Sequence, residues 1–192
     1  PLANMALRAA RKAGQIIVRA LDRVDRVNAE QKGKNDWVSD IDRAAEAAII
    51  ETLLTAYPDH GFLGEESGHR EGHDGHTTWI IDPLDGTTNF LRGIPHFAIS
   101  IACRQHGRLE HAVVFDPLRD EAFVASRGYG AQLNGKRLRV TRLPSLDGAI
   151  IGTGIPYRQK AAHLQPYLGM VGAVTQEAAD LRRAGSAALD LA

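Results

Sequence analysis

The sequence predicts an α+β protein whose elements stack in layers. Two segments with helical spacing open the chain, a run of short strand-like segments follows, and strand and helix patterns alternate near the end. At 192 residues the chain is long enough for one sizeable domain or two small ones. We assign residues 1–145 to a helix pair plus an antiparallel sheet that carries the metal site argued below. Residues 146–192 begin a second α/β layer that the sequence leaves incomplete.

The first elements are two helices. Apolar residues recur at helical spacing from Leu2 to about Val24, with arginines mostly between them, which favours a helix with a solvated basic face over a membrane-binding one. Residues 31–36 are typical of a loop. Ser39 followed by an acid three residues later predicts a helix start, and Tyr57-Pro58 ends that helix.

The middle of the chain predicts a sheet. Short turns between closely spaced strands favour an antiparallel meander. The expected strands are His60–Leu63, Thr77–Ile81, Phe97–Arg104, Leu109–Phe115 and Glu121–Ala125. Beyond them we expect a strand at Ala149–Thr153, a helix at Ala161–Ala179 and the opening of another helix at Gly185–Asp190.

Composition excludes several classes of protein. Lys plus Arg equals Asp plus Glu, 23 each, so we expect neither direct nucleic-acid binding nor a membrane partner. Cys103 is the only cysteine, which rules out an intrachain disulfide and fits a reducing compartment; core packing explains it better than reactivity. No apolar run approaches the roughly 18 residues of a membrane span, so we expect a cytoplasmic location.

The stretch WIIDPLDGTTNF, residues 79–90, holds two acids three positions apart. Pro83 excludes a helix interior, and Asp followed by Pro predicts a β-turn, which brings its first and fourth residues within about 7 Å. Asp82 and Asp85 would then face one point, where two negative charges repel unless a cation lies between them.

Two neighbouring features complete this acidic cluster. Glu65 and Glu66 lie in a Gly-flanked loop just upstream, and oxygen donors of this kind suit hard cations such as Mg²⁺. Residues 86–89, Gly-Thr-Thr-Asn, can present successive backbone amides to a phosphate. Metal ions beside an anion site indicate metal-assisted hydrolysis of a phosphate ester.

These residues resemble the inositol monophosphatase family. The paired stretches GEES (Gly64 to Ser67) and WIIDPLDGTTNF carry the resemblance, and QKGKNDWVSDIDRAAE and RRAGSAALDLA are similar to its bacterial SuhB type, so that it covers essentially the whole chain. It implies an αβαβα sandwich, usually a homodimer, that hydrolyses monoesters such as myo-inositol 1-phosphate. It also implies two or three Mg²⁺ ions and inhibition by Li⁺.

The resemblance assigns roles around the metals. Glu65 and Asp82 would hold the first ion with the backbone carbonyl of Leu84, and Asp82 and Asp85 the second. Glu65 and Thr87 would orient the attacking water.

Further roles concern the substrate. The backbone amides of Gly86 and Thr87 would hold phosphate oxygens, while Asp85 and Ala187 would face inositol hydroxyls. Family members continue past GSAALDLA to a Trp-Asp motif that completes the second metal site, and we expect such a segment to follow Ala192, because the last helix stops in mid-pattern.

Three residues have supporting roles by the same resemblance. Glu66 would support the loop, and Asp42 matches an acid near the metals, although an acid at a helix start also favours the helix dipole. Lys32 would lie near the phosphate, although a loop lysine is also commonly solvated. In HREGHDGH, residues 69–76, three histidines allow a Zn²⁺ site, with a solvated loop as the plainer interpretation.

Two alternatives to inositol phosphate hydrolysis stay open. Fructose bisphosphate, histidinol phosphate and 3′-phosphonucleotides are small monoesters open to the same chemistry. The SuhB type also resembles a partner in transcription antitermination of ribosomal RNA, acting with Nus factors and RNA polymerase. Neutral net charge favours a protein partner over RNA for that role.

Overall fold

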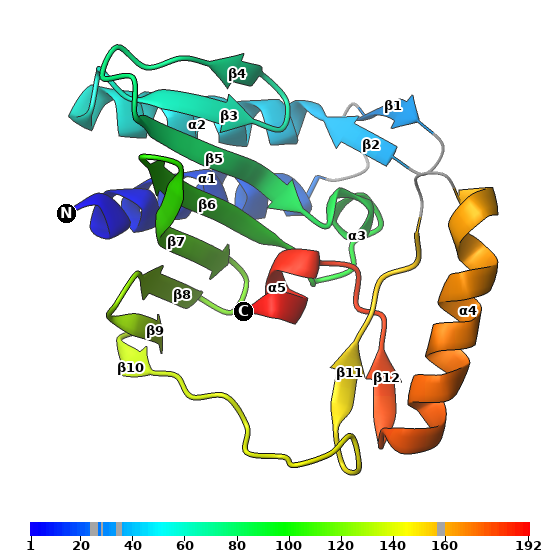
Figure 1. Ribbon diagram of the computed structural model, residues 1–192. Helices are drawn as coiled ribbons and strands as arrows, with labels where there is room; N and C mark the ends of the chain where they lie inside the picture. The colour runs from blue at the N-terminus through cyan, green and yellow to red at the C-terminus, as the bar shows by residue number, and fades with distance from the viewer. Residues whose placement is uncertain (24–26, 28, 34–35, 157–159) are drawn as a thin grey trace.

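Two long helices cover one face of an eight-stranded sheet (Figure 1). The structure is a computed structural model that describes residues 1–23, 27, 29–33, 36–156 and 160–192, with residues 31–33, 36–38, 160 and 161 described by their backbone alone. Helix α1 (Leu2–Leu21) packs on the middle of the sheet, and α2 (Asp40–Ala56) packs beside α1. The layered α+β class predicted from the sequence is confirmed.

Small residues bring α1 close to its neighbours. Ala6, Ala9, Ala10 and Ala13 are each at most 1% exposed, so the helix buries a narrow stripe of small side chains. A Cβ at Gly14 would lie 3.0 Å from the Phe115 ring, which shows how little space separates helix and sheet there. The predicted helix is confirmed but ends at Leu21; its expected end at Val24 lies outside the described residues.

Helix α2 begins and ends where the sequence predicts. The Ser39 hydroxyl accepts the backbone N–H of Asp42, and the Asp42 carboxylate accepts the backbone N–H of Ser39, a reciprocal cap. Tyr57 closes the helix. The expected loop at residues 31–36 is wrong in part, because β1 (Ala29–Gly33) and β2 (Asp36–Ser39) pair there as antiparallel strands, and residues 34 and 35 lie outside the described chain.

The large sheet is mixed. Its strand order is β10-β9-β8-β7-β6-β5-β3-β4, and every neighbouring pair from β5 to β10 is antiparallel, as the meander predicts. The pair β3–β5 is parallel, so the antiparallel expectation is wrong at this point. The intervening segment is long enough to return the chain to the same end of the sheet. The strands are β3 (Gly61–Gly64), β4 (Gly68–Arg70), β5 (Thr77–Asp85), β6 (Ala98–Gln105), β7 (Arg108–Asp116), β8 (Glu121–Ser126), β9 (Gly130–Leu133) and β10 (Lys136–Arg137).

The core lies between the helix pair and the sheet. Along β5, Thr77, Trp79 and Ile81 are buried, which is the period-two pattern of a strand with one face against helices. Cys103 of β6 is fully buried beside them, and burial raises the pKa of its thiol to about 12. Core packing therefore describes this cysteine, as expected.

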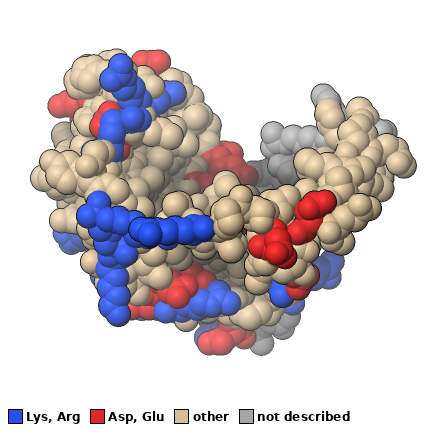
Figure 2. Space-filling model, turned by 60° about the horizontal axis from the view of Figure 1, so that its bottom comes forward, with Lys and Arg blue, Asp and Glu red and all other residues tan. Residues whose placement is uncertain are grey.

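The last quarter of the chain forms a second group of elements. Strands β11 (Ile150–Gly152) and β12 (Asp180–Arg182) pair in parallel, and α4 (Lys160–Glu177) connects them. Figure 2 shows a recess on the lower face, between the sheet and the α4 side, with acidic side chains inside it. Two short helices, α3 (Thr87–Leu91) and α5 (Ala187–Leu191), lie where the two groups of elements meet (Figure 1). Among the described residues, no helix is long and apolar enough to cross a membrane.

Candidate functional site

A β-bulge presents the two acids of the central motif. Asp82 pairs with Ser100 and Asp85 with Ala98, so β5 has two residues between these pairs where β6 has one. The predicted β-turn is therefore wrong, because strand pairing with β6 continues through Pro83. A bulge bends its strand and re-aims side chains, which serves the same end of turning both acids away from the regular ladder.

The backbone turns sharply after the bulge. Gly86 has φ +104°, a left-handed conformation that side chains disfavour, and α3 begins at the next residue. A Cβ at Gly86 would also lie 3.1 Å from the carbonyl oxygen of His96. Glycine is required here on both grounds, and the backbone leaves the sheet directly beside Asp85.

Asp82 is surrounded by other acids. Its pKa is raised to about 8, first by burial, then by the negative charges of Glu65 and Asp85, and by a hydrogen bond with Glu65. The backbone N–H of Leu84 donates to Asp82 Oδ1 at 3.2 Å, which opposes that shift only in part. Three carboxyl groups therefore lie close enough for their charges to act on one another.

This donor set fits a hard divalent cation. All three groups offer oxygen, and a cation among them would relieve the repulsion that raises the pKa of Asp82. In the described part of the chain, no three acidic, histidine or cysteine side chains are arranged so that they could hold a metal ion. Glu65, Asp82 and Asp85 would therefore have to change side-chain conformation to bind a cation together, and Asp85 Oδ2 already accepts hydrogen bonds from Ser186 and Ala188.

Thr87 connects the motif to the start of α2. Its hydroxyl lies 2.9 Å from Asp42 Oδ1 and 3.1 Å from the carbonyl oxygen of Leu84. Asp42 is 1% exposed, and its other oxygen caps α2 by accepting the Ser39 N–H at 2.9 Å. The helix-start interpretation of Asp42 is confirmed by this cap, and its other oxygen holds Thr87. Its place near the metals stays a prediction.

Glu46 holds the upstream acidic loop and was not singled out from the sequence. It is 2% exposed, and its two carboxylate oxygens accept the backbone N–H groups of Glu66 at 3.0 Å and Ser67 at 2.8 Å. A Cβ at Gly64 would lie 2.6 Å from Glu46 Oε2, so a larger residue at that position would displace the Glu46 carboxylate from the loop it holds. Glu46 lies four residues after Asp42 on a predicted helix. Because residues i and i+4 share a helix face, this spacing is the sequence signal that could have identified Glu46.

The C-terminal segment closes against the motif. Asp85 Oδ2 accepts the Ser186 hydroxyl at 2.6 Å and the Ala188 N–H at 2.7 Å, so Asp85 caps α5. Asn89 donates to the carbonyl oxygens of His96 at 2.7 Å and Ala184 at 2.9 Å. The sequence does not predict the bonds from Ser186 to Asp85 and from Asn89 to Ala184, because these partners lie 101 and 95 residues apart along the chain.

The other residues predicted for the site are Ala187, Lys32 and the histidines of the loop 69–76. Ala187 is exposed at the start of α5, next to the two groups that hold Asp85. Lys32 lies on β1, and its side chain is outside what the structure describes. In the histidine-rich loop, His73 lies 3.6 Å from Asp59 and His76 lies 3.6 Å from Asp74, and no group of three metal-binding side chains forms in the described residues there.

Comparison with known sequences shows which protein family this chain matches. The sequence model described as the inositol monophosphatase family matches residues 1–192. The chain is 54% identical to "Nus factor SuhB" of Escherichia coli K12 and 53% identical to the protein of the same name in Pseudomonas aeruginosa; in each case the match covers all of this chain and 72% of the relative.

Two solved structures of related proteins have the same fold as this chain over most of its length. The extragenic suppressor protein suhB from Bartonella henselae superposes with a TM-score of 0.94 at 43% identity, over 98% of this chain and 72% of that one. An IMPase from Thermotoga maritima superposes with a TM-score of 0.84 at 33% identity, over 97% of this chain and 69% of that one.

Proposed function

The chain belongs to the inositol monophosphatase family, and from that premise we propose that it is a Mg²⁺-dependent phosphatase that hydrolyses myo-inositol 1-phosphate to inositol and phosphate. The observation that carries the proposal is the placement of three carboxyl groups together: the bulge of β5 presents Asp82 and Asp85, and the backbone N–H of Glu65 donates to the carbonyl oxygen of Ile81 at 3.1 Å. Burial and the charges of Glu65 and Asp85 raise the pKa of Asp82 to about 8. A cluster of acids held against their mutual repulsion is typical of a cation site.

The proposed ligands follow from this cluster. Glu65 and Asp82 would hold one Mg²⁺ together with the carbonyl oxygen of Leu84, and Asp82 and Asp85 a second; a third ion is compatible with the donor set. Bound Mg²⁺ would neutralise phosphate charge and lower the pKa of a water. The Leu84 carbonyl has two lone pairs, so it can face a cation and still accept the Thr87 hydroxyl 3.1 Å away.

Thr87 would orient the attacking water. Its single hydroxyl proton points to Asp42 or to Leu84, which leaves its lone pairs to accept a hydrogen bond from that water. Glu65 would accept the other proton of the water. Asp42 thus acts as a positioning residue, because it fixes the direction in which Thr87 accepts.

The proposed substrate contacts lie just after the bulge. The backbone amides of Gly86 and Thr87 would bind phosphate oxygens, and Asp85 and Ala187 would face the inositol hydroxyls. Residues 1–145 would form the unit that carries the metals, and residues 146–192 would begin a second α/β layer. A homodimer is part of the proposal and is checked by light scattering.

The test is phosphate release from myo-inositol 1-phosphate with and without Mg²⁺ and then with Li⁺. Asp82→Asn, which removes the shared ligand, should lose at least about a thousandfold in rate while a circular dichroism melt still shows a folded protein. The same assay is carried out with fructose bisphosphate, histidinol phosphate and a 3′-phosphonucleotide as substrates. Mg²⁺-independent release, or full activity in Asp82→Asn, would refute the proposed chemistry.

A protein-binding role is the second candidate, because relatives more than 50% identical are named Nus factors. Such a role would involve Nus factors or RNA polymerase and need no catalysis. Asp82→Asn separates the two functions better than a change at Asp85, which also holds α5 through Ser186 and Ala188. A variant that loses hydrolysis but still binds a Nus factor in a pull-down with purified proteins would support two separate roles.

A further inference from the structure

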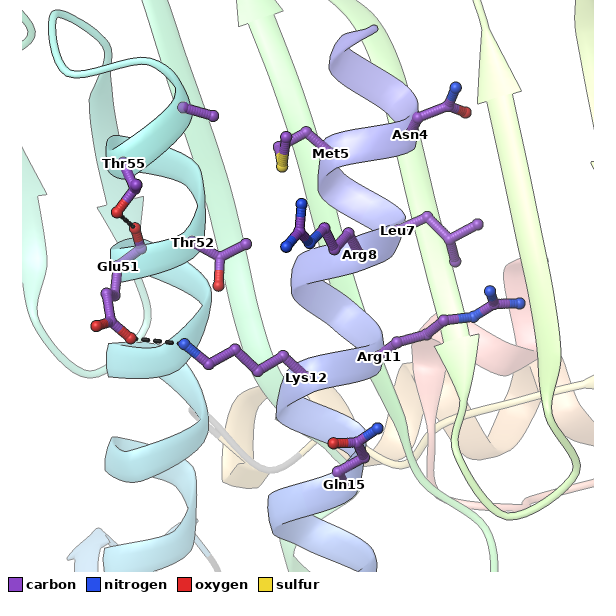
Figure 3. A pocket seen from close by; sticks show the side chains of 11 residues that line it. Asn4, Met5, Leu7, Arg8, Arg11, Lys12, Gln15, Glu51, Thr52 and Thr55 are labelled. Carbon is purple, nitrogen blue, oxygen red and sulfur yellow. Dashed lines mark hydrogen bonds and ion pairs between the residues drawn. The ribbon is translucent and has the colours of Figure 1, made fainter.

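A groove runs between α1 and α2 on the side of the helices that faces away from the sheet (Figure 3). Its volume is about 690 Å³. Arg8, Arg11 and Lys12 line it from α1, and Glu51 and Thr52 line it from α2. None of these five residues belongs to the proposed metal site.

The α1 wall of this groove is strongly basic. Between Leu2 and Leu21 the helix carries four cations and no Asp or Glu, although the whole chain has zero net charge. Lys12 Nζ lies 2.6 Å from Glu51 Oε2 and is neutralised by it. Arg8 and Arg11 are exposed and make no ion pair within the described residues.

Stability of the helix does not account for these arginines. Both lie beyond the first turn of α1 and before its last turn, where the helix dipole does not favour cations. In Figure 3 Arg8 extends between the two helices, whereas Arg11 points to the outer side of α1. One unneutralised guanidinium group thus lies inside the groove and a second on the outer rim of its α1 wall, and each can form paired hydrogen bonds with a carboxylate.

The shape of the groove favours a protein segment. Its α1 wall runs from Asn4 to Gln15, which is about 17 Å along the axis and equals three turns of a partner helix. Met5 adds apolar surface on the side of α1 that faces α2, and Leu7 adds it on the outer side near Arg11 (Figure 3). Among the described residues that line the groove there is no aromatic side chain, whereas binding of single-stranded nucleic acid commonly uses aromatic rings as stacking platforms.

We propose that this groove binds an acidic amphipathic helix of a partner protein. Its carboxylates would pair with Arg8 and Arg11, and its apolar side chains would pack on Met5 and Leu7, the helix-in-groove mode of recognition. The proposal stands apart from the phosphatase proposal, because it uses none of the residues assigned to hydrolysis.

The test uses a defined probe. A fluorescein-labelled helical peptide of about 15 residues presents Glu at i, i+4 spacing on one face and Leu on the other, and a matched peptide carries Gln in place of Glu. Fluorescence anisotropy at 50 and 200 mM salt should show binding of the Glu peptide alone, weakened by salt. Arg8→Glu with Arg11→Glu should weaken this binding at least about tenfold.

Matched controls make the outcome decisive. Arg137→Glu with Arg142→Glu, two exposed arginines outside the groove, should leave binding unchanged. A peptide with Lys in place of Glu should bind the Arg8/Arg11 charge-reversal variant, whose fold is checked by circular dichroism. Arg8→Gln with Arg11→Gln gives a smaller loss without charge reversal.

Three results would overturn the proposal. The first is no binding of the Glu peptide at 50 mM salt, and the second is equal binding by the wild type and the Arg8/Arg11 charge-reversal variant. The third is Arg8-dependent binding of a 15-nucleotide oligouridine with none of the peptide, which would make the groove a nucleic-acid surface.

Discussion

Replacing Glu46 with Gln tests whether a buried carboxylate on α2 sets the geometry of the metal-binding loop. Glu46 accepts two backbone N–H groups, from Glu66 and Ser67. The glutamine amide keeps one acceptor oxygen, but its NH₂ group then faces the other N–H, and two donors oppose each other.

The expected magnitude follows from those two contacts. A hydrogen bond to a charged group contributes about 1.5–3 kcal/mol, and an unmatched buried donor costs about 1–3 kcal/mol. Glu46→Gln should therefore destabilise the ordered loop by about 2–3 kcal/mol. Since about 1.4 kcal/mol is a factor of ten, Mg²⁺ affinity should fall roughly 30- to 100-fold if the loop orders on binding.

Two assays separate this effect from a general loss of stability. Isothermal titration calorimetry measures Mg²⁺ affinity, and phosphate release against Mg²⁺ concentration shows whether high Mg²⁺ restores kcat. Glu51→Gln is the control, because this exposed acid of the same helix bonds only to Lys12 and to its own helix. An unchanged Mg²⁺ affinity in Glu46→Gln, with lower stability in urea, would mean that Glu46 supports the fold but not the site.

Three further outcomes are expected. In EDTA, the free energy of unfolding measured in urea should fall as the pH rises from about 4 to about 8. The reason is that Asp82 loses its proton at its ordinary pKa of 3.8 in the unfolded chain but keeps it up to a pKa of about 8 in the native protein. Asp82→Asn should flatten this pH dependence, and Mg²⁺ should oppose it. Thr87→Val should reduce kcat at least about tenfold with little change in KM, whereas Thr87→Ser should keep most activity. Gly64→Ala, whose Cβ would lie 2.6 Å from Glu46, should raise the Mg²⁺ requirement and lower the melting temperature.

The elements that the sequence predicts best are those whose causes are local. The cap at Ser39 and the end of α2 at Tyr57 depend on neighbours within a few residues, and both are found where expected. The turn predicted at Asp82 is wrong because the pairing partner, Ser100, lies on a different strand and extends the ladder past Pro83. Local turn chemistry could not reveal that partner.

The contacts that shape the candidate site are mostly long-range. The acidic residues of the motif were visible in the sequence, but Ser186 bonds to Asp85 from 101 residues away, and Glu46 reaches the loop from 20 residues upstream. Both contacts exist only once α5 and α2 have packed. The candidate metal-binding residues could therefore be named from sequence, whereas the residues that support them could not.

One helix fixes two separate parts of the site, and that imposes a strict register. Asp42 and Glu46 lie about one turn apart on α2, where one holds Thr87 and the other the Glu66–Ser67 backbone. Inserting or deleting a single residue between them would rotate one side chain by about 100° relative to the other. An insertion in a surface loop away from the site would leave both contacts in place, whereas a change in the length of this four-residue interval would break one of them.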